Sequence, residues 1–198
     1  MFNGLSIKDL TEEDIKLKFI TPALDKATWD IQTQIRCEYY YTAGKINVRE
    51  NVASRGKGKK VDYLLSYKSN IPIAIVEAKD NKVVASHGIQ QAIDYANDLD
   101  IPFAYSSNGT GFYEHDMITG LERELGINEF PTPEELWNRY IKEKQLDEEQ
   151  LKLITEPYYF MSAYKTPRYY QRISINNTIE AIAKGQKRIL LVMSTGTG

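Results

Sequence analysis

The sequence predicts an α/β fold with a mixed central sheet covered by helices on both sides. Residues 71–76 form a short apolar run, rich in β-branched side chains and bounded by polar residues, which is typical of a strand buried on both faces. In residues 89–99 apolar side chains recur every three or four positions, which indicates an amphipathic helix. A second buried strand is predicted at residues 101–106. Buried strands that alternate with a helix place the chain in the α/β class.

Composition restricts the class of protein and its surroundings. The chain has 198 residues, of which 42% are hydrophobic and 26% charged, so we expect one globular domain, or one domain and part of another. A net charge of −2 argues against a general attraction to nucleic acid, so any DNA contact must come from a local patch. Cys37 is the only cysteine, which excludes an internal disulfide and a four-cysteine zinc site. No signal peptide or transmembrane span is visible, and we expect a cytoplasmic protein without membrane contact.

The first helix is predicted over residues 11–26. Thr11 is suited to cap it, and the acids Glu12 and Glu13 suit the positive end of its dipole. Pro22 is expected to break or bend this helix, because proline cannot donate the helical backbone hydrogen bond.

Strands are predicted between Trp29 and Val52. Residues 31–37 alternate and lead into an aromatic run, which indicates one strand, and residues 42–45 have the composition of a turn. We expect Ile46 to begin the returning strand.

A basic segment follows, with four cations within six residues: Arg55, Lys57, Lys59 and Lys60. Its glycines predict a mobile loop directly before the charged cluster described next. Basic side chains in that place would contact DNA phosphates, which supplies affinity with little sequence selectivity. A solvated turn is the alternative.

Three charged residues form the candidate centre of the site. Asp62 lies at the start of another strand, predicted at residues 61–67. Glu77 and Lys79 project from one face at the end of the strand predicted at residues 71–76. Pairing of the two strands would bring these groups together. Two carboxylates and water suit Mg²⁺, which can orient a phosphate and lower the pKa of a bound water, while the lysine holds the water or the phosphate. An ion pair between Glu77 and Lys79 at a sheet edge is the alternative.

The helix at residues 89–99 adds two polar side chains. Gln91 and Tyr95 are four residues apart and flank the apolar stripe, so they are placed to reach over the strand ends. The alternative is that they are ordinary residues at the border of a buried face.

After the strand predicted at residues 101–106, a further strand is predicted at residues 112–116. His115 within it is expected to be a surface residue rather than a ligand. Residues 130–133 contain two prolines and mark the best domain boundary. From there to residue 155 the chain is charged and helical, which suits a linker, with Thr132 as the helix cap.

The last segment has features of a nucleotide-binding domain. Gln171 precedes a predicted helix at residues 173–183, and a strand is predicted at residues 189–193. A glycine-rich loop follows directly, whose backbone N–H groups would cradle nucleotide phosphates. The loop residues are Gly196, Thr197 and Gly198. A glycine-rich tail without such a role is the alternative.

Asp62, the triplet Glu77-Ala78-Lys79 and the pair Gln91-x-x-x-Tyr95 together resemble the signature of PD-(D/E)xK nucleases with the additional helix motif of the RecB-like branch. The similarity extends along most of the chain to the restriction (R) subunit of type I restriction enzymes. One departure is that no proline precedes Asp62, at a position that varies in the wider superfamily.

The resemblance implies a restriction-endonuclease-like fold and a Mg²⁺-dependent DNA endonuclease. It assigns catalytic roles to five residues: Asp62, Glu77, Lys79, Gln91 and Tyr95. It assigns metal ligation to Asp62 and Glu77, with an acid of the first helix, Glu12 or Glu13, facing the metal.

The C-terminal segment resembles the start of a superfamily 2 helicase motor, with Gln171 in the adenine-reading motif and the last glycines in the Walker A loop that binds ATP. We therefore expect the N-terminal piece of a larger motor-nuclease. Its nuclease domain would span residues 1–130, a helical linker residues 131–165, and the truncated start of a RecA-like helicase domain residues 166–198. The implied partners are double-stranded DNA and the specificity and modification subunits of a restriction complex. An inactive DNA-holding module and a free-standing, structure-specific nuclease are the alternatives.

Overall fold

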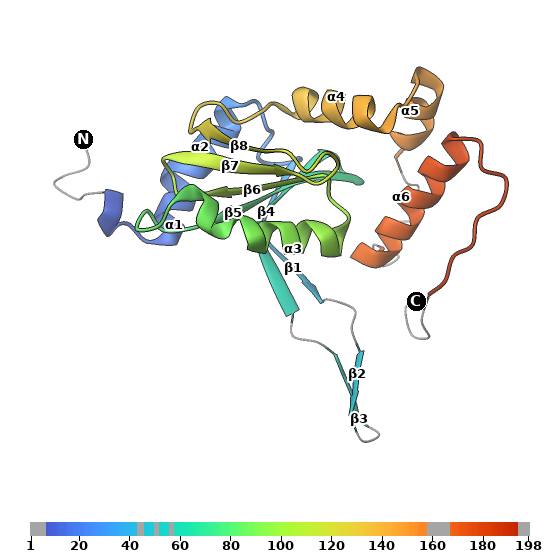
Figure 1. The fold of residues 1–198 in the computed structure, drawn as a ribbon, viewed down its shortest axis with the longest axis horizontal. Coiled ribbons are helices and arrows are strands. Elements are labelled where there is room, and N and C mark those ends of the chain that lie inside the picture. Colours follow the sequence, from blue (N-terminus) through green and yellow to red (C-terminus); the bar gives the residue numbers. More distant parts are fainter. Residues whose placement is uncertain (1–6, 43–45, 50–51, 56–57, 158–166, 194–198) are drawn as a thin grey trace.

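The computed structural model describes residues 7–42, 46–49, 52–55, 58–157 and 167–193, and its centre is a six-stranded mixed sheet (Figure 1). The strand order is β1-β4-β5-β6-β7-β8, and within this sheet only β5 and β6 pair in parallel. The strands span Ile35–Thr42 (β1), Gly58–Lys68 (β4), Ile71–Ala78 (β5), Phe103–Ser107 (β6), Gly111–Asp116 (β7) and Glu122–Gly126 (β8). The prediction of a mixed sheet in an α/β fold is confirmed.

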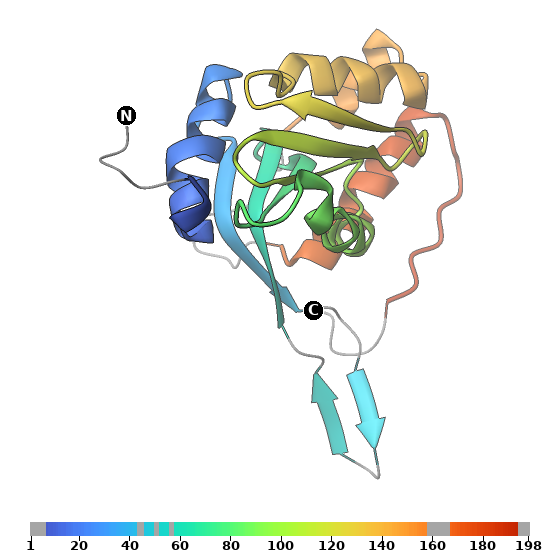
Figure 2. The ribbon, with the colours of Figure 1, turned by 60° about the vertical axis from the view of Figure 1, so that its left-hand side comes forward.

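Helices cover both faces of this sheet, and Figure 2 shows the N-terminal helices and α3 on opposite sides of the strands. The long helices are α3 (Ile89–Leu99), α4 (Pro133–Lys144) and α6 (Tyr169–Ala183). The shorter ones are η1 (Ile7–Asp9), α1 (Glu12–Ile15), η2 (Lys16–Ile20), α2 (Thr21–Lys26), η3 (Ala85–Gly88) and α5 (Glu148–Ile154). No helix of the described residues is long and apolar enough to span a membrane.

One face of the sheet buries the larger apolar cluster. Ile15 and Leu24 of the N-terminal helices pack there with Phe103 and Tyr105 of β6. Each large apolar side chain that is fully buried contributes about 1.5–3 kcal/mol to folding. The cluster therefore anchors the N-terminal helices beside β4 and β5.

The opposite face carries α3. Its small residues Ala92 and Ala96 are buried against Leu64 and Ile75 of the sheet. Small side chains on the contact stripe let the helix lie close to the strands, which brings its first turns next to the end of β5. The predicted helix bounds, residues 89–99, match those observed.

The N-terminal helix begins as predicted, because the Thr11 hydroxyl accepts the Asp14 backbone N–H at 3.2 Å. Pro22 does not break it. The helix instead contains a π-helical segment, η2, in which the Thr21 N–H bonds to the Lys16 carbonyl five residues earlier. A π-turn of this kind shifts the hydrogen-bond pattern next to the residue that lacks a donor, so the helix continues to Lys26.

Two strand predictions near the N-terminus are wrong in detail. Residues 31–33 form a turn rather than a strand, because the Asp30 carboxylate accepts the backbone N–H groups of Gln32 and Thr33. The strand that starts at Ile46 does not return along β1. It is β2 (Ile46–Arg49), which pairs with β3 (Val52–Arg55) in a separate two-stranded sheet, and β1 pairs with β4.

Residues 189–193 are not a strand, contrary to the prediction, and Leu190 and Val192 are 85% and 84% exposed. A strand needs a neighbouring backbone, and no described strand pairs with this segment. The edge strand β8 was not predicted, since its sequence lacks apolar alternation.

The segment after residue 130 is helical as predicted, and Thr132 caps α4 with Pro133 in its first turn. Its expected linker character is wrong for α4. Leu136 and Trp137 are buried in the larger cluster, and the Trp137 ring stacks on Tyr67 of β4 with centroids 4.6 Å apart. The positions of the domain boundaries stay predictions.

Candidate active site

Asp62 and Glu77 lie at the same level of adjacent strands. Strand β4 pairs antiparallel with β5, and Tyr63 lies opposite Val76. Asp62, one residue before Tyr63, therefore lies opposite Glu77, one residue after Val76. Both acids are buried, at 6% and 4% exposure. The Ala78 backbone N–H donates to Asp62 Oδ2 at 2.9 Å, which fixes that carboxylate against β5. Strand pairing thus brings the two predicted acids together.

Glu77 has one satisfied and one unsatisfied oxygen. Lys79 Nζ donates to Oε1 at 2.8 Å, whereas Oε2 is buried and has no hydrogen-bond partner among the described residues. Burial and then the negative charge of Asp62 raise the pKa of Glu77 to about 7. A buried oxygen left without a partner costs free energy, so this atom marks a position where a cation or a donor fits.

A chain of hydrogen bonds leads from Glu77 to helix α3. Lys79 Nζ also donates to Gln91 Oε1 at 3.1 Å, and Gln91 Nε2 donates to the Tyr95 hydroxyl at 2.8 Å. The predicted pair therefore reaches over the strand end and holds the lysine. Gly88 leaves room for it, since a Cβ atom there would lie 3.1 Å from the Lys79 side chain. The motifs in the sequence did not indicate this glycine.

The first helix brings one of its two candidate acids toward the site. Burial and then the charge of Asp62 raise the pKa of Glu12, whereas the charge of Lys79 lowers it. Glu12 therefore interacts electrostatically with both groups. The Glu13 side chain is 75% exposed and pairs with Lys16 at 2.5 Å instead. Glu12 is thus the better placed of the two, and its ligation of a metal stays a prediction.

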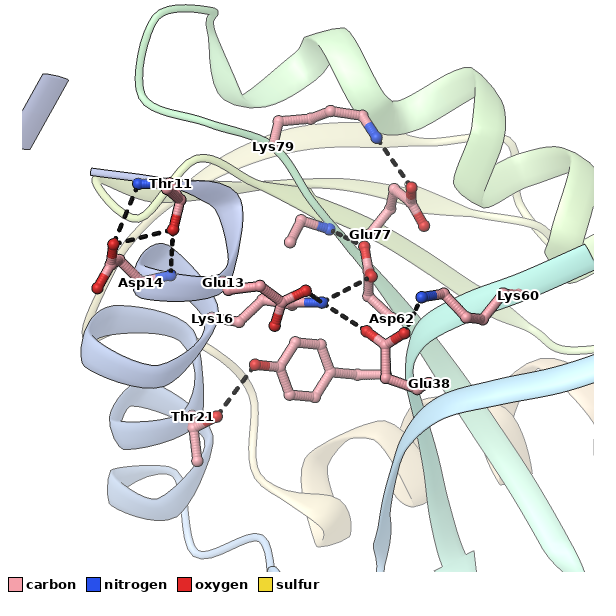
Figure 3. Close-up of polar contacts among 12 residues, drawn as sticks. Thr11, Glu13, Asp14, Lys16, Thr21, Glu38, Lys60, Asp62, Glu77 and Lys79 are labelled. Carbon is pink, nitrogen blue, oxygen red and sulfur yellow. Dashed lines mark hydrogen bonds and ion pairs between the residues drawn. The ribbon is translucent and has the colours of Figure 1, made fainter. Parts of the chain in front are cut away.

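Two further charged residues, which sequence reasoning missed, surround Asp62 (Figure 3). Lys16 of η2 is 7% exposed, and its Nζ lies 3.3 Å from Asp62 Oδ1 and 2.5 Å from Glu38 Oε1. Glu38 belongs to β1, where its φ of 54° is left-handed. The available signal was the spacing of Lys16, Ile20 and Ala23, which places a lysine on the buried stripe of the first helix.

The basic segment differs from the mobile loop that was predicted. Lys59 and Lys60 lie in β4, because Tyr41 and Tyr40 of β1 pair with them and extend the strand. Lys59 Nζ contacts Asp98 at 2.6 Å, and Lys60 pairs with Glu38. Arg55 ends β3, and its side chain and Lys57 lie outside the described residues. The two described cations therefore stand on a strand beside the acidic site.

The donor set fits a hard cation such as Mg²⁺, which is bound by one or two carboxylates and keeps several waters. Asp62 and Glu77 supply the carboxylates, and within the described parts of the chain Glu77 Oε2 has no other partner. In the part of the chain that the structure describes, no three His, Cys, Asp or Glu side chains are close enough to hold a metal alone. Water would therefore complete the coordination. Lys79, held by Glu77 and Gln91, stands beside this position.

The predicted nucleotide residues are less completely placed. Gln171 lies in the first turn of α6, where its Oε1 accepts the Arg168 backbone N–H at 2.9 Å. Gly196, Thr197 and Gly198 lie outside the described residues. Binding of ATP by these four residues stays a prediction. His115 pairs with Glu122 at 2.9 Å, away from the acids of the site.

We expect the metal-free chain to lose stability as the pH rises through neutrality. The Glu77 carboxyl has a pKa of about 7 in the folded chain against an ordinary value of 4.5, so the folded state binds this proton more tightly than the unfolded state. Its contribution is fully present below about pH 4.5 and is lost as the pH rises through about 7, with a slope of up to about 1.4 kcal/mol per pH unit.

Urea unfolding in the presence of a chelator, from about pH 5 to about pH 8, measures this slope. Glu77→Gln should flatten it and stabilise the chain at the upper end, because the glutamine cannot ionise. The exposed Glu124→Gln is the control and should leave the slope unchanged. Equal slopes in the Glu77 variant and the parent chain would contradict the assignment.

Comparisons with known proteins place the chain in a family. Residues 30–131 match the family described as the type I restriction enzyme R protein N terminus, and residues 164–198 match the family of the type III restriction enzyme res subunit. The type I restriction enzyme EcoAI endonuclease subunit of Escherichia coli is 45% identical over 198 residues, which cover 98% of this chain and 24% of that protein. The chain thus spans about a quarter of that relative's length.

A solved structure is similar along nearly the whole chain. It is a fragment of an HsdR-type subunit of a type I restriction enzyme from Vibrio vulnificus YJ016, with a TM-score of 0.82 and 39% identity. The match covers 96% of this chain and 36% of that one. This chain belongs to the family of the type I restriction enzyme R subunit and corresponds to its N-terminal part.

Proposed function

We propose that this region is the DNA-cleaving domain of a type I restriction enzyme R subunit and that it hydrolyses phosphodiester bonds with Mg²⁺. The observation that carries the proposal is the buried Glu77 Oε2 beside Asp62, which no described residue bonds, with Lys79 Nζ at 2.8 Å from the other Glu77 oxygen. Burying two carboxylates and an ammonium group at one point costs folding free energy. A role in stabilising the charge that develops during phosphodiester hydrolysis would explain why they are there.

Each side chain has a distinct role in this proposal. Asp62 and Glu77 hold the ion, which when bound polarises the scissile phosphate and lowers the pKa of a water. The Lys79 ammonium group donates a hydrogen bond to the attacking water or to a phosphate oxygen, so its position decides the geometry of attack. Gln91 and Tyr95 act through it, since their hydrogen bonds hold the lysine over the end of β5.

The proposal extends to the larger protein. Residues 166–198 would begin an ATP-dependent motor that moves double-stranded DNA, which is supported by the match of residues 164–198 to the res subunit family. The specificity and modification subunits of a restriction complex would be the protein partners, and ATP the second cofactor. The Escherichia coli relative is about four times as long as this chain, which is long enough to include a complete motor domain.

The test is DNA cleavage by the complete enzyme with its partner subunits and ATP. Plasmid DNA should be cut with Mg²⁺ and remain intact when Mg²⁺ is chelated or when Asp62→Asn is present. A complex that binds DNA equally with and without the ion and never cuts would instead indicate a DNA-holding module. Cutting by the Asp62→Asn enzyme at the normal rate would reject the site.

The cations near the site should contribute non-specific DNA affinity that weakens with salt. The Lys59 and Lys60 side chains are 37% and 56% exposed, so phosphates can reach them despite their acidic neighbours. Replacing Lys57, Lys59 and Lys60 with alanine should make the plot of log affinity against log salt less steep, by about 0.9 for each phosphate that the variant no longer neutralises.

Fluorescence anisotropy of a labelled duplex titrated with the 198-residue chain at several salt concentrations measures this slope. Lys152→Ala on α5 removes an exposed lysine elsewhere and serves as the control, with no change expected. If the triple variant kept the parent slope, the basic segment would be an ordinary solvated surface.

A further inference from the structure

Lys16 is a buried lysine enclosed by acids. Its Nζ lies 2.5 Å from Glu13, 2.5 Å from Glu38 and 3.3 Å from Asp62, and its side chain is 8% exposed. Three elements supply the acids: α1, β1 and β4. Figure 3 shows the four side chains converging at the point where the first helix meets the sheet.

Two irregular backbone features produce this contact. Lys16 begins the π-helical segment, and Glu38 has a left-handed φ of 54° within β1, a conformation that is strained for a non-glycine residue. Glu38 lies where β1 would face Asp62, since the registered pairs on either side are Cys37 with Tyr63 and Tyr39 with Val61. Unusual backbone at both ends of one ion pair indicates a function that depends on it.

The contact fixes the carboxylate that the proposed ion needs. Asp62 Oδ2 accepts the Ala78 N–H, and Oδ1 faces the Lys16 ammonium, so both oxygens have fixed directions. In two-metal nucleases the ions lie about 3.5–4 Å apart and stabilise both the attacking and the leaving oxygens. Here a positive charge already touches Asp62 at 3.3 Å, and it belongs to the protein.

We propose that Lys16 is a positioning residue that takes the place of a second metal ion, so that it orients Asp62 and limits the site to one divalent cation. The inference rests on the proposed metal-dependent function. It goes further in assigning the number of ions and in explaining why Glu13 and Glu38, although near Asp62, are not ligands. With the ammonium removed, these three carboxylates would lose the positive charge between them, and a divalent ion that keeps several waters would be drawn to the place of the Lys16 Nζ.

The test measures Mn²⁺ binding to the 198-residue chain by calorimetry and by electron paramagnetic resonance, in which two neighbouring ions are recognised by their spin coupling. The parent chain should bind one ion. Lys16→Gln should bind two ions that are spin coupled, whereas Lys16→Arg, which keeps the charge, should bind one. Lys18→Gln on the same helix, where the lysine pairs only with Asp14 among the described ion pairs, is the matched control and should bind one.

The outcomes separate this inference from the proposed function. Two ions in the parent chain, or one ion in a folded Lys16→Gln chain, would overturn the role of Lys16 and leave the nuclease proposal standing. No bound ion in the parent chain would overturn the metal-dependent function itself. If Lys16→Gln is unfolded without metal, thermal melting is repeated with Mn²⁺. Recovery of folding with two bound ions supports the inference, and failure of Mn²⁺ to restore folding contradicts it.

Discussion

Replacing Glu77 with glutamine in the complete enzyme should abolish DNA cleavage and leave ATP hydrolysis nearly unchanged. Glutamine keeps the shape of the side chain and one acceptor oxygen, but it removes the charge that would hold the ion and that pairs with Lys79 at 2.8 Å. A loss of about 4 kcal/mol of transition-state stabilisation lowers the cleavage rate about 10³-fold, since each 1.36 kcal/mol is tenfold. ATP hydrolysis should persist because Glu77 lies in β5, outside the segment proposed for nucleotide binding.

Cleavage of plasmid DNA and release of phosphate from ATP are measured on the same preparation, after circular dichroism has verified the fold. Asp62→Asn and Lys79→Ala should give the same separation of activities. Gln90→Ala is the matched control, because Gln90 precedes Gln91 on α3 but bonds to Asp94 at the helix surface. Retained cleavage in the Glu77 and Lys79 variants would reject the site, and loss of both activities in folded protein would mean that the two functions are coupled.

The parts of the fold that depend on neighbouring residues could be predicted from the sequence. The bounds of α3 follow from its apolar periodicity, and the caps Thr11 and Thr132 follow from hydrogen bonds that close within three residues. The buried strand β5 was recognised by its apolar run, although it extends two residues further, to Ala78. Such signals are local, so they need no knowledge of the tertiary structure.

Strands whose existence depends on a partner were harder to predict. Strand β8 is mostly exposed and is held by backbone pairing to β7, so its sequence carries no alternation. Residues 189–193 show the opposite case, since they are apolar but have no paired strand within the described chain. Strand propensity reflects packing against neighbours more than an intrinsic preference.

The site divides in the same way. Asp62, Glu77 and Lys79 were found because strand alternation and one short turn bring them together. Lys16 and Glu38 come from elements 46 and 24 positions before Asp62, and the direction of Glu38 depends on a positive φ that no pattern predicts. Contacts set by tertiary packing and by local backbone strain could not be read from periodicity.

The largest effect on stability is expected from the buried acid Glu114. Its carboxylate, 2% exposed, receives Arg123 from β8 at 3.0 Å, Arg139 from α4 at 2.8 Å and the Tyr105 hydroxyl at 2.5 Å. Burial opposes its ionisation, but the hydrogen bonds from Arg139, Arg123 and Tyr105 outweigh burial and lower its pKa. This carboxylate therefore joins β6, β7, β8 and α4, and it stabilises the chain above its ordinary titration range, an effect lost as the pH falls.

Glu114→Gln should lower the free energy of unfolding by about 3–5 kcal/mol at neutral pH, because both guanidinium groups lose their buried partner and only Arg139 keeps another carboxylate, Asp116 at 2.8 Å, among the described ion pairs. Two guanidinium groups would then face one another without the charge between them. Urea unfolding measures the loss, and a double-mutant cycle with Arg139→Gln should show that the two changes are not additive, since both remove the same ion pair. Glu122→Gln on β8 is the control, because its bonds to Tyr113 and His115 are exposed to solvent and should contribute much less to stability. If Glu114→Gln lowered the free energy of unfolding no more than this control does, α4 would be held by the packing of Leu136 and Trp137 alone. The buried carboxylate would then only neutralise the nearby arginines without adding stability.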